Sequence, residues 1–277
     1  MDMTDFRFSP TSINLFRGCP RRFYYTYIEK VERLPSIHLL KGTIVHSVLE
    51  EFYTKYGLDI IKLLDANWKL YQSELKETGA DLEIEYNDCK DMLIFHKLIH
   101  DTEINGLVSS GKLSSKELAF ENIKPVFNEK RLDDSKFNIC CKIDRVDINK
   151  YTGIITLGDY KTSKRYGLSI SEDYLRQHAI MGLIYKNVEN VLPNFGTTIY
   201  LRYGIVDRIR ITPDLIKYAI DEVNTVRALA CTEGIDNYPM KQTELCRWCD
   251  FIDTCSGSKK DELKKSKEKL KKIFGGS

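Results

Sequence analysis

The sequence predicts an α/β protein with a helical N-terminal third, a strand-rich middle and a helical end. Apolar residues recur at near-helical spacing early in the chain, whereas the middle has β-branched and aromatic runs divided by polar turns. With 277 residues, 42% of them hydrophobic, the chain can bury a full core as one elaborated domain or as two. No segment of the sequence is long and apolar enough to suggest a membrane span.

The helical third begins with a helix-start signal. Ser9 precedes Pro10, and serine is a favoured cap while proline suits the first helical turn. A second helix is expected over 38–56, where apolar residues repeat at helical spacing and bury one face. Two more helical stretches, 59–75 and 84–104, show no evident chemistry, and we interpret 59–111 as a helical insertion.

Three strands are expected next, over 116–123, 137–148 and 153–161. Helices are expected over 171–188 and 213–230, with strands between them over 197–211. The lysine-rich segment 259–274 has the pattern of a solvated amphipathic helix, and following a nucleic-acid backbone is the alternative role.

The segment 149–153 is typical of a tight hairpin, because its last residue, Gly153, can take a positive φ angle. A turn centred between residues 151 and 152 places three pairs face to face: Ile148 with Ile155, Val146 with Leu157, and Asp144 with Asp159. Alternation along the strand then puts Lys161 on the same side as Asp159.

Two carboxylates beside a lysine form a suitable site for a hard divalent cation and an activated water. The hairpin is apolar between the turn and these residues, which favours a packed site with Asp144, Asp159 and Lys161 at its end. The alternative is a solvated Asp-Lys pair on an edge strand.

Four cysteines have the spacing of a metal centre. Cys246 and Cys249 are separated by two residues, Cys255 follows closely, and Cys19 in the loop-like stretch 17–22 is the best candidate for a fourth ligand. Spacing alone allows zinc or an iron-sulfur cluster, and unligated thiols in a reducing cytosol are the alternative. We interpret the other four cysteines as ordinary buried residues: Cys89, Cys140, Cys141 and Cys231.

The formal net charge of +2 is too small to argue nucleic-acid binding from overall balance. A local cluster at 17–27 mixes arginines with aromatic residues, which would suit phosphates and bases, or else form a buried aromatic helix face with arginines at its rim. Without an apolar signal segment, secretion has no support, so we expect a cytoplasmic protein.

The segments 142–147 and 157–163, which read KIDRVD and LGDYKTS, resemble the core of the PD-(D/E)XK nuclease superfamily, specifically its RecB-like exonuclease branch. The arrangement of one cysteine followed by three resembles the iron-sulfur members: CRISPR-associated RecB-like exonucleases and related nuclease modules of DNA-end processing enzymes. The resemblance implies a restriction-endonuclease-like core with a central mixed sheet flanked by helices. It implies one nuclease domain over 1–277, with an N-terminal helical region at 1–58, a core at 112–212 and a C-terminal cluster region at 213–277.

The resemblance also implies roles for individual residues. His46, which periodicity alone would make a core histidine, becomes a metal ligand with Asp144, Asp159 and the carbonyl of Tyr160. Lys161 becomes the catalytic lysine, and the further site residues implied are Glu117 and Gln177. The chain departs from the pattern in two places: Met181 stands where a tyrosine is expected, with Tyr185 one turn further along as a substitute, and Ile143 replaces the proline before Asp144.

The function implied is hydrolysis of phosphodiester bonds with Mn²⁺ or Mg²⁺, by an exonuclease acting on single-stranded DNA ends in CRISPR adaptation or in recombination and repair. A [4Fe-4S] cluster would hold the two ends of the chain together so that DNA passes close to the metal. CRISPR adaptation or DNA-repair proteins are the partners expected besides DNA. The competing hypothesis is a catalytically silent nuclease fold that binds DNA or a protein. Cleavage direction and oligomeric state stay open.

Overall fold

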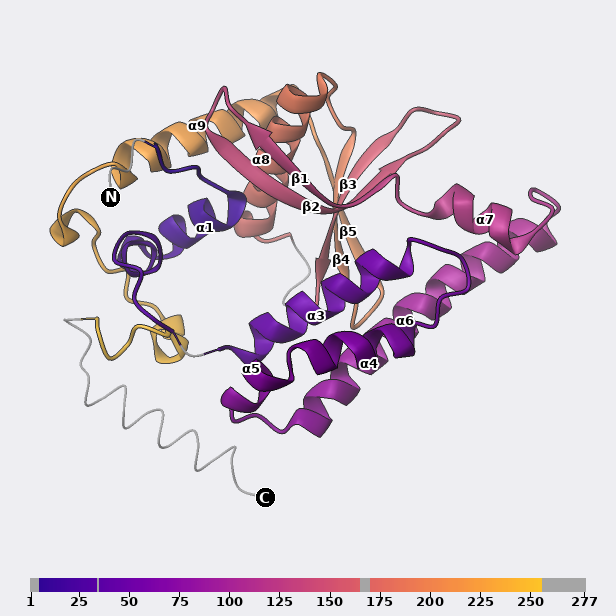
Figure 1. Cartoon of the computed structure of the whole chain (residues 1–277). Helices are drawn as coiled ribbons and strands as arrows, with labels where there is room; N and C mark the ends of the chain where they lie inside the picture. Colours follow the sequence, from indigo (N-terminus) through magenta and orange to yellow (C-terminus); the bar gives the residue numbers. More distant parts are fainter. Residues whose placement is uncertain (1–4, 34, 165–169, 256–277) are drawn as a thin grey trace. The chain divides into compact units, whose positions relative to one another are not determined.

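The structure is a computed structural model that describes residues 5–33, 35–164 and 170–255 (Figure 1). The chain divides into two compact units, one formed by Met1–Leu34 with Glu222–Ser277 and the other by Pro35–Asp221. The expected helical tail over 259–274 lies outside the described residues. No helix in the described part of the chain has the length and apolar character needed to cross a bilayer.

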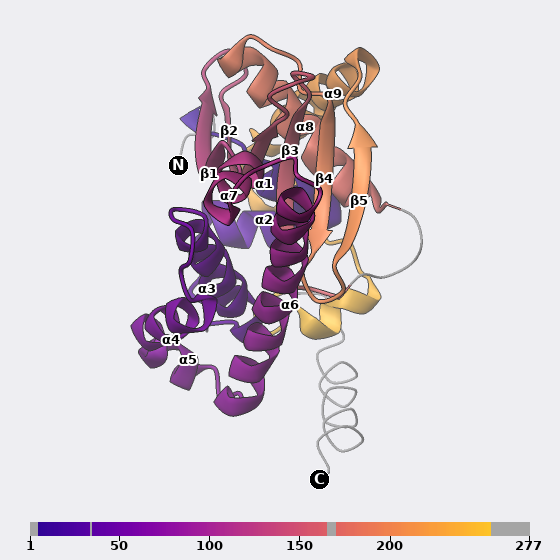
Figure 2. The same ribbon diagram turned by 90° about the vertical axis from the view of Figure 1, so that its right-hand side faces the viewer.

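The larger unit contains a five-stranded sheet. Its strands are β1 (Phe127–Asp134), β2 (Ile139–Ile148), β3 (Ile155–Lys161), β4 (Phe195–Tyr200) and β5 (Ile205–Arg210). They lie side by side in chain order, as Figure 2 shows. Neighbouring strands are antiparallel except β3 and β4, which are parallel and are joined through helix α8 (Glu172–Glu189). This mixed sheet with flanking helices agrees with the expected restriction-endonuclease-like α/β fold.

Both sides of β3 are covered because alternate residues face different helices. On one side, Tyr160 packs into the apolar core made by α3 (Ile37–Phe52), α4 (Ile60–Leu70), α5 (Gln72–Glu77), α6 (Leu82–Ser109) and α7 (Lys116–Ile123). On the other, Asp159 contacts Gln177 of α8. The helices expected over 38–56, 84–104 and 171–188 are confirmed, with shifted ends, whereas the helical stretch expected over 59–75 is divided into α4 and α5.

The prediction of a strand over 116–123 was wrong, since these residues form helix α7. The hydroxyl of Ser115 accepts a hydrogen bond from the backbone N–H of Leu118 and so caps the helix. Burial of Ala119 and Phe120 on one face then favours the helix over a strand. The first strand of the sheet is instead β1, a segment for which the sequence pattern predicted no strand.

The hairpin between β2 and β3 has the predicted register. Val146 pairs with Leu157 and Ile148 with Ile155. Gly153 in the connection has a φ of +68°, as a residue with no Cβ allows. The last pair of the ladder is Arg145 with Gly158, so the two strands separate immediately before Asp144 and Asp159.

The smaller unit is held together by aromatic packing. Its helices are α1 (Pro10–Gly18), α2 (Pro20–Phe23), the π-helical turn η2 (Tyr24–Ile28), and the short η3 (Ile235–Asn237) and η4 (Glu244–Trp248), while α9 (Pro213–Ala230) crosses the boundary between the units. Ser9 caps α1 as expected, in a reciprocal pair of hydrogen bonds with Ser12. The ring of Phe23 is fully buried between aromatic neighbours, which is the buried-face alternative for the cluster at 17–27.

Candidate metal-dependent active site

The site begins where β2 and β3 separate. Beyond the last ladder pair, the backbone N–H of Tyr160 donates to Oδ2 of Asp144 over 2.7 Å. The carboxylate of Asp144 therefore takes the place of a ladder partner, and its other oxygen is left to face helix α3. This is a local consequence of the hairpin register combined with an acidic residue at the point of separation.

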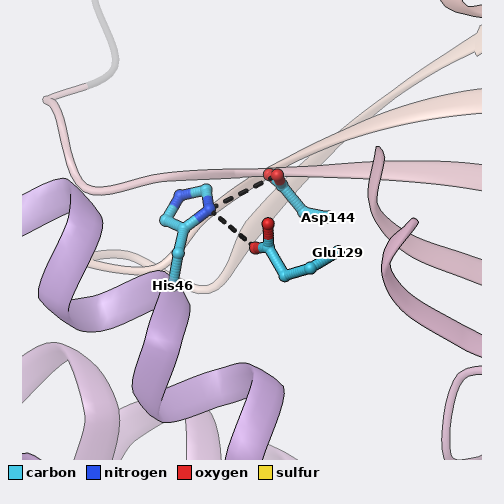
Figure 3. A group of neighbouring side chains, drawn as sticks. All are labelled: His46, Glu129 and Asp144. Carbon is cyan, nitrogen blue, oxygen red and sulfur yellow. Dashed lines mark hydrogen bonds and ion pairs between the residues drawn. The ribbon is translucent and has the colours of Figure 1, made fainter. Parts of the chain in front are cut away.

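Three potential metal ligands converge at this point, as Figure 3 shows. Nδ1 of His46, on α3, lies 3.2 Å from Oε1 of Glu129 on β1 and 3.3 Å from Oδ1 of Asp144 on β2. One ligand atom from each residue lies within 4.8 Å of the other two. The other ring nitrogen of His46, Nε2, is 3.2 Å from the carbonyl oxygen of Tyr160.

Glu129 is the ligand that the sequence pattern did not reveal. It occupies β1 opposite Asp144, between the pairs Asn128–Arg145 and Lys130–Ile143. Its φ of +48° is unusual for a residue with a side chain in a strand, and such a conformation costs roughly 1 kcal/mol or more. Its side chain is only 6% exposed and is held by the ammonium of Lys142 at 2.6 Å. Backbone strain at a buried acid is characteristic of functional sites.

The charges of the three ligands are strongly coupled. Burial alone would lower the pKa of His46, but its contacts with Asp144 and Glu129 raise it to about 10. Burial would raise the pKa of Glu129, but His46 and Lys142 lower it below its ordinary value. For Asp144, burial raises the pKa above the usual range against the opposing effect of His46. Two buried carboxylates thus draw positive charge to this position, as a cation site requires.

A second group lies beside the ligands, on the α8 side of β3. Nζ of Lys161 is 2.7 Å from Oδ2 of Asp159, and Nε2 of Gln177 donates to Oδ1 of the same carboxylate at 2.5 Å. Burial alone would lower the pKa of Lys161, but Asp159 raises it above its ordinary value, so the ammonium stays charged. Lys161 also lies over the ring of Tyr174, 5.3 Å from its centroid.

A buried arginine fixes Tyr160 between these two groups. The Nε of Arg145 donates to both carboxylate oxygens of Asp147, and its Nη1 donates to the hydroxyls of Tyr53 and Tyr160 at 3.0 and 3.4 Å. The Tyr53 hydroxyl is in turn 2.8 Å from Nε2 of His96. This network holds the Tyr160 side chain on the side of the sheet that packs against α3 and α6. It thereby orients the Tyr160 backbone, which lies next to the ligands.

The structure brings together most of the residues predicted from the sequence: His46, Asp144, Asp159, Tyr160, Lys161 and Gln177. Asp159 does not belong to the convergent ligand trio, because its two oxygens face Lys161 and Gln177. Glu117 lies at an exposed position on helix α7 rather than on a strand, and Glu129 is the acid next to His46.

The residues considered for the tyrosine of the glutamine motif are both buried. Met181 and Tyr185 lie in α8 at 2% and 3% exposure. The aromatic residue beside Lys161 is instead Tyr174, one turn before Gln177. It precedes the glutamine in the chain, so it does not stand at the position where the motif expects a tyrosine.

The predicted cysteine ligands gather in the smaller unit. Cys19 lies between α1 and α2, and the other three lie in or just after η4. All four line one cavity of about 60 Å³: Cys19, Cys246, Cys249 and Cys255. In the described part of the chain, no three of these sulfur atoms lie within 4.8 Å of one another.

The donor sets fit the two expected kinds of metal. An imidazole with two carboxylates and a carbonyl oxygen suits Mn²⁺ or Mg²⁺, and four thiols around one cavity suit an iron-sulfur cluster or zinc. A single zinc ion would hold each sulfur at about 2.3 Å, whereas an iron-sulfur cluster spreads the four thiolates over several iron atoms. The lining of the cavity by four thiols is compatible with either.

The whole arrangement is matched by one protein family. Residues 7–256 match the PD-(D/E)XK nuclease superfamily, so the chain belongs to that superfamily. No curated protein matches the chain. Membership, together with the trio of His46, Glu129 and Asp144, indicates a nuclease that binds a divalent metal.

Proposed function

We propose that this protein is a divalent-metal-dependent DNA exonuclease acting on single-stranded ends. The observation that carries the proposal is the position of the Lys161–Asp159 ion pair directly beside the trio of His46, Glu129 and Asp144. A cation site and a charged lysine at one point of the sheet are the groups that metal-dependent phosphodiester hydrolysis requires. Family membership supports the reaction class, and the resemblance to RecB-like enzymes supports DNA ends as the substrate.

The ligand trio would hold Mn²⁺ or Mg²⁺. The resemblance adds the Tyr160 carbonyl and Asp159 as further oxygen donors, and Asp159 would then exchange a contact with Lys161 or Gln177 for the ion. When bound, such an ion polarises the scissile phosphate and lowers the pKa of a bound water. The ammonium of Lys161 would offset negative charge that develops on the phosphate. The Gln177 amide contacts both members of this ion pair, since its Oε1 accepts from Lys161 and its Nε2 donates to Asp159, and it would keep the pair oriented.

We also propose a [4Fe-4S] cluster in the cysteine cavity of the smaller unit. Four thiols around one space support a metal centre, and the resemblance to iron-sulfur members of the superfamily favours a cluster over zinc. The physiological setting proposed is CRISPR adaptation or DNA recombination and repair, with proteins of those systems as partners. The resemblance of the cysteine arrangement to iron-sulfur RecB-like exonucleases supports that setting.

The decisive experiment is digestion of single-stranded DNA labelled at its 5′ or 3′ end, with Mn²⁺, with Mg²⁺ and with neither. We expect metal-dependent shortening from one end, and Lys161→Ala should slow it by about 100-fold or more, since a transition-state charge partner is lost. Lys150→Ala is the matched control, because Lys150 lies in the exposed hairpin connection. Undiminished cleavage by Lys161→Ala would remove the assignment. Binding of DNA without cleavage by the native protein would favour the competing hypothesis of a catalytically silent nuclease fold.

A further inference from the structure

We propose that Trp248 is a base-stacking residue with which the cysteine-rich unit holds single-stranded DNA. The inference rests on the proposed function, which makes DNA the ligand, and it adds a binding residue outside the metal-dependent site. Three observations carry it: the exposure of the Trp248 ring, the fixed backbone under it, and the cationic side chains of the same unit.

The Trp248 side chain is 69% exposed, although aromatic residues of this unit otherwise pack against each other. Within the described residues its ring has no aromatic neighbour, and its indole N–H has no hydrogen-bond partner. The other tryptophan, Trp68, packs edge-on against Tyr86 at 5.4 Å. A large aromatic ring exposed to water lacks the stabilisation that burial of its apolar surface provides, and a stacked base would cover that surface.

The backbone that presents Trp248 is fixed by its own hydrogen bonds. The N–H of Cys246 donates to the carbonyl of Thr243 at 3.0 Å, and the N–H of Cys249 donates to the carbonyl of Cys246 at 3.1 Å. The ring therefore projects from the short helix η4 between two of the proposed cluster ligands. A backbone that is ordered before binding lowers the conformational entropy lost when a base stacks on the ring it carries.

The charge of the same unit suits a phosphate backbone. Arg22 and Arg33 both approach one carboxylate, that of Asp250, at 3.5 and 3.7 Å, and each side chain is 40% exposed. One carboxylate neutralises only one of two guanidinium groups, so the group of Arg22, Arg33 and Asp250 keeps a net positive charge, and Asp250 lies two residues after Trp248 in the chain. The ammonium of Lys241 is a further exposed cation, donating to the carbonyl of Arg17. Aromatic faces combined with exposed cations are the usual means of holding single-stranded nucleic acid.

A protein partner fits these features less well. Hot spots of protein interfaces centre on clustered apolar residues from which water is excluded. Among the residues near Trp248 in sequence whose side chains the structure describes, Met240 is the large exposed apolar one, and charged side chains such as Glu244 and Arg247 lie between the two. Single-stranded DNA is therefore the occupant to which the charge and the lone ring are complementary.

The test uses the whole protein in a Lys161→Ala background, so that DNA is bound and not cut. Trp68→Phe leaves Trp248 as the sole tryptophan of the two in the chain. Its fluorescence should be quenched by a saturating oligo-dT strand, whose binding is followed independently by the anisotropy of a labelled strand. Trp248→Ala should raise the Kd by about ten-fold, since stacking on one aromatic ring has that order of effect.

Three further variants separate stacking from a merely structural effect. Trp248→Phe should retain much of the affinity, whereas Trp248→Leu, which is apolar without a π face, should lose it. Tyr151→Ala, at an 87% exposed aromatic in the larger unit, should leave the Kd unchanged. Metal content of each variant is measured in parallel, and the Phe–Leu comparison is made between proteins of equal content.

The results that overturn the inference are distinct from those that overturn the nuclease. DNA binding with unchanged Trp248 fluorescence, or equal Kd values for the native, Phe and Leu forms, would refute stacking while the metal-dependent cleavage stands. Absence of any DNA binding would refute both. If Trp68→Phe does not fold, the fluorescence difference between the native and Trp248→Phe proteins decides the same question.

Discussion

His46 occupies a position where a proton and a divalent cation compete. Its Nδ1 faces two buried carboxylates, and without a metal these keep the imidazole protonated with a pKa of about 10. Metal binding at this nitrogen must displace that proton, so metal affinity should increase with pH. The same two carboxylates thus stabilise the metal-free protein and provide the cation site.

The raised pKa makes the stability of the metal-free protein depend on pH. A folded-state pKa near 10, against an ordinary value of 6.5, gives a contribution that is complete below about pH 6.5 and is lost as pH rises toward 10. We expect the free energy of unfolding of the metal-free native protein to exceed that of His46→Gln most at pH 6.5 and to approach it by pH 10. Denaturant titrations of both proteins across this range measure the difference. A difference that does not change with pH would contradict the ion-pair interpretation.

The choice between two acidic residues can be tested directly. Glu129 contacts His46, whereas Glu117 is exposed on α7, so Glu129→Gln should weaken Mn²⁺ binding and cleavage by about ten-fold or more. Glu117→Gln is the comparison, with both parameters expected near native values. Calorimetric Mn²⁺ titration and the end-labelled digestion measure them. If Glu117→Gln weakens Mn²⁺ binding and cleavage more than Glu129→Gln does, Glu117 is the functional acid and the assignment of Glu129 as a metal ligand is refuted.

Helix α8 must approach the sheet closely, because it carries Gln177 to the site. The contact depends on Gly196 in β4, where an added Cβ would lie 2.7–2.9 Å from three atoms of His178. His178 is buried at 1% exposure and has its Nε2 2.8 Å from the hydroxyl of Thr198. An added Cβ at Gly196 would therefore force a shift of the buried imidazole, of α8 or of the strand.

Gly196→Ala should therefore destabilise the protein and reduce activity together. We expect a loss of about 1–3 kcal/mol of unfolding free energy, as for other overpacked cores, and slower cleavage because Gln177 shifts with α8. Gly106→Ala is the control: that glycine is exposed in α6 with nothing near its Cβ position, and alanine should stabilise the helix by about 0.5–1 kcal/mol. Equal stabilities for the two variants in denaturant titrations would contradict the close contact.

The smaller unit joins segments from far apart in the chain, and its cysteines do the same. Cys19 comes from the N-terminal segment, whereas the three others come from residues 246–255, and all four line one cavity. A cluster bound there would link the two segments through coordinate bonds. Because a metal site that exists only in the folded state contributes its binding energy to folding, the unit should depend on its metal.

Cys249→Ser should consequently lose metal and stability at once. We expect loss of the broad absorbance near ~400 nm and a lower melting temperature. Cys231 was predicted to be buried, but it is exposed and lies outside the cavity, so Cys231→Ser should keep both properties. Absorbance spectra, iron and zinc analysis and thermal melts are sufficient. A colourless native protein with stoichiometric zinc would contradict the iron-sulfur proposal, even if Cys249→Ser is destabilising.

The predictions that held were those governed by local rules. Ser9 and Pro10 start α1, and the turn ending at Gly153 sets the pairing of Val146 with Leu157. From that register alone, Asp144, Asp159 and Lys161 could be placed at one end of the hairpin. The prediction for 116–123 failed because β-branched and aromatic content in a short segment does not distinguish a strand from a helix packed on one face.

By itself, the sequence determined the β2–β3 hairpin, its acidic end and the cysteine spacing, because turn chemistry and side-chain alternation act over a few residues. Only the tertiary structure decided that Glu129 completes the ligand trio and that Tyr174 stands beside Lys161. Glu129 reaches the site through a positive φ in β1 and a pairing with β2, and α8 brings Tyr174 back across the sheet. Such contacts depend on how separate elements pack, and no periodicity within one segment records that packing.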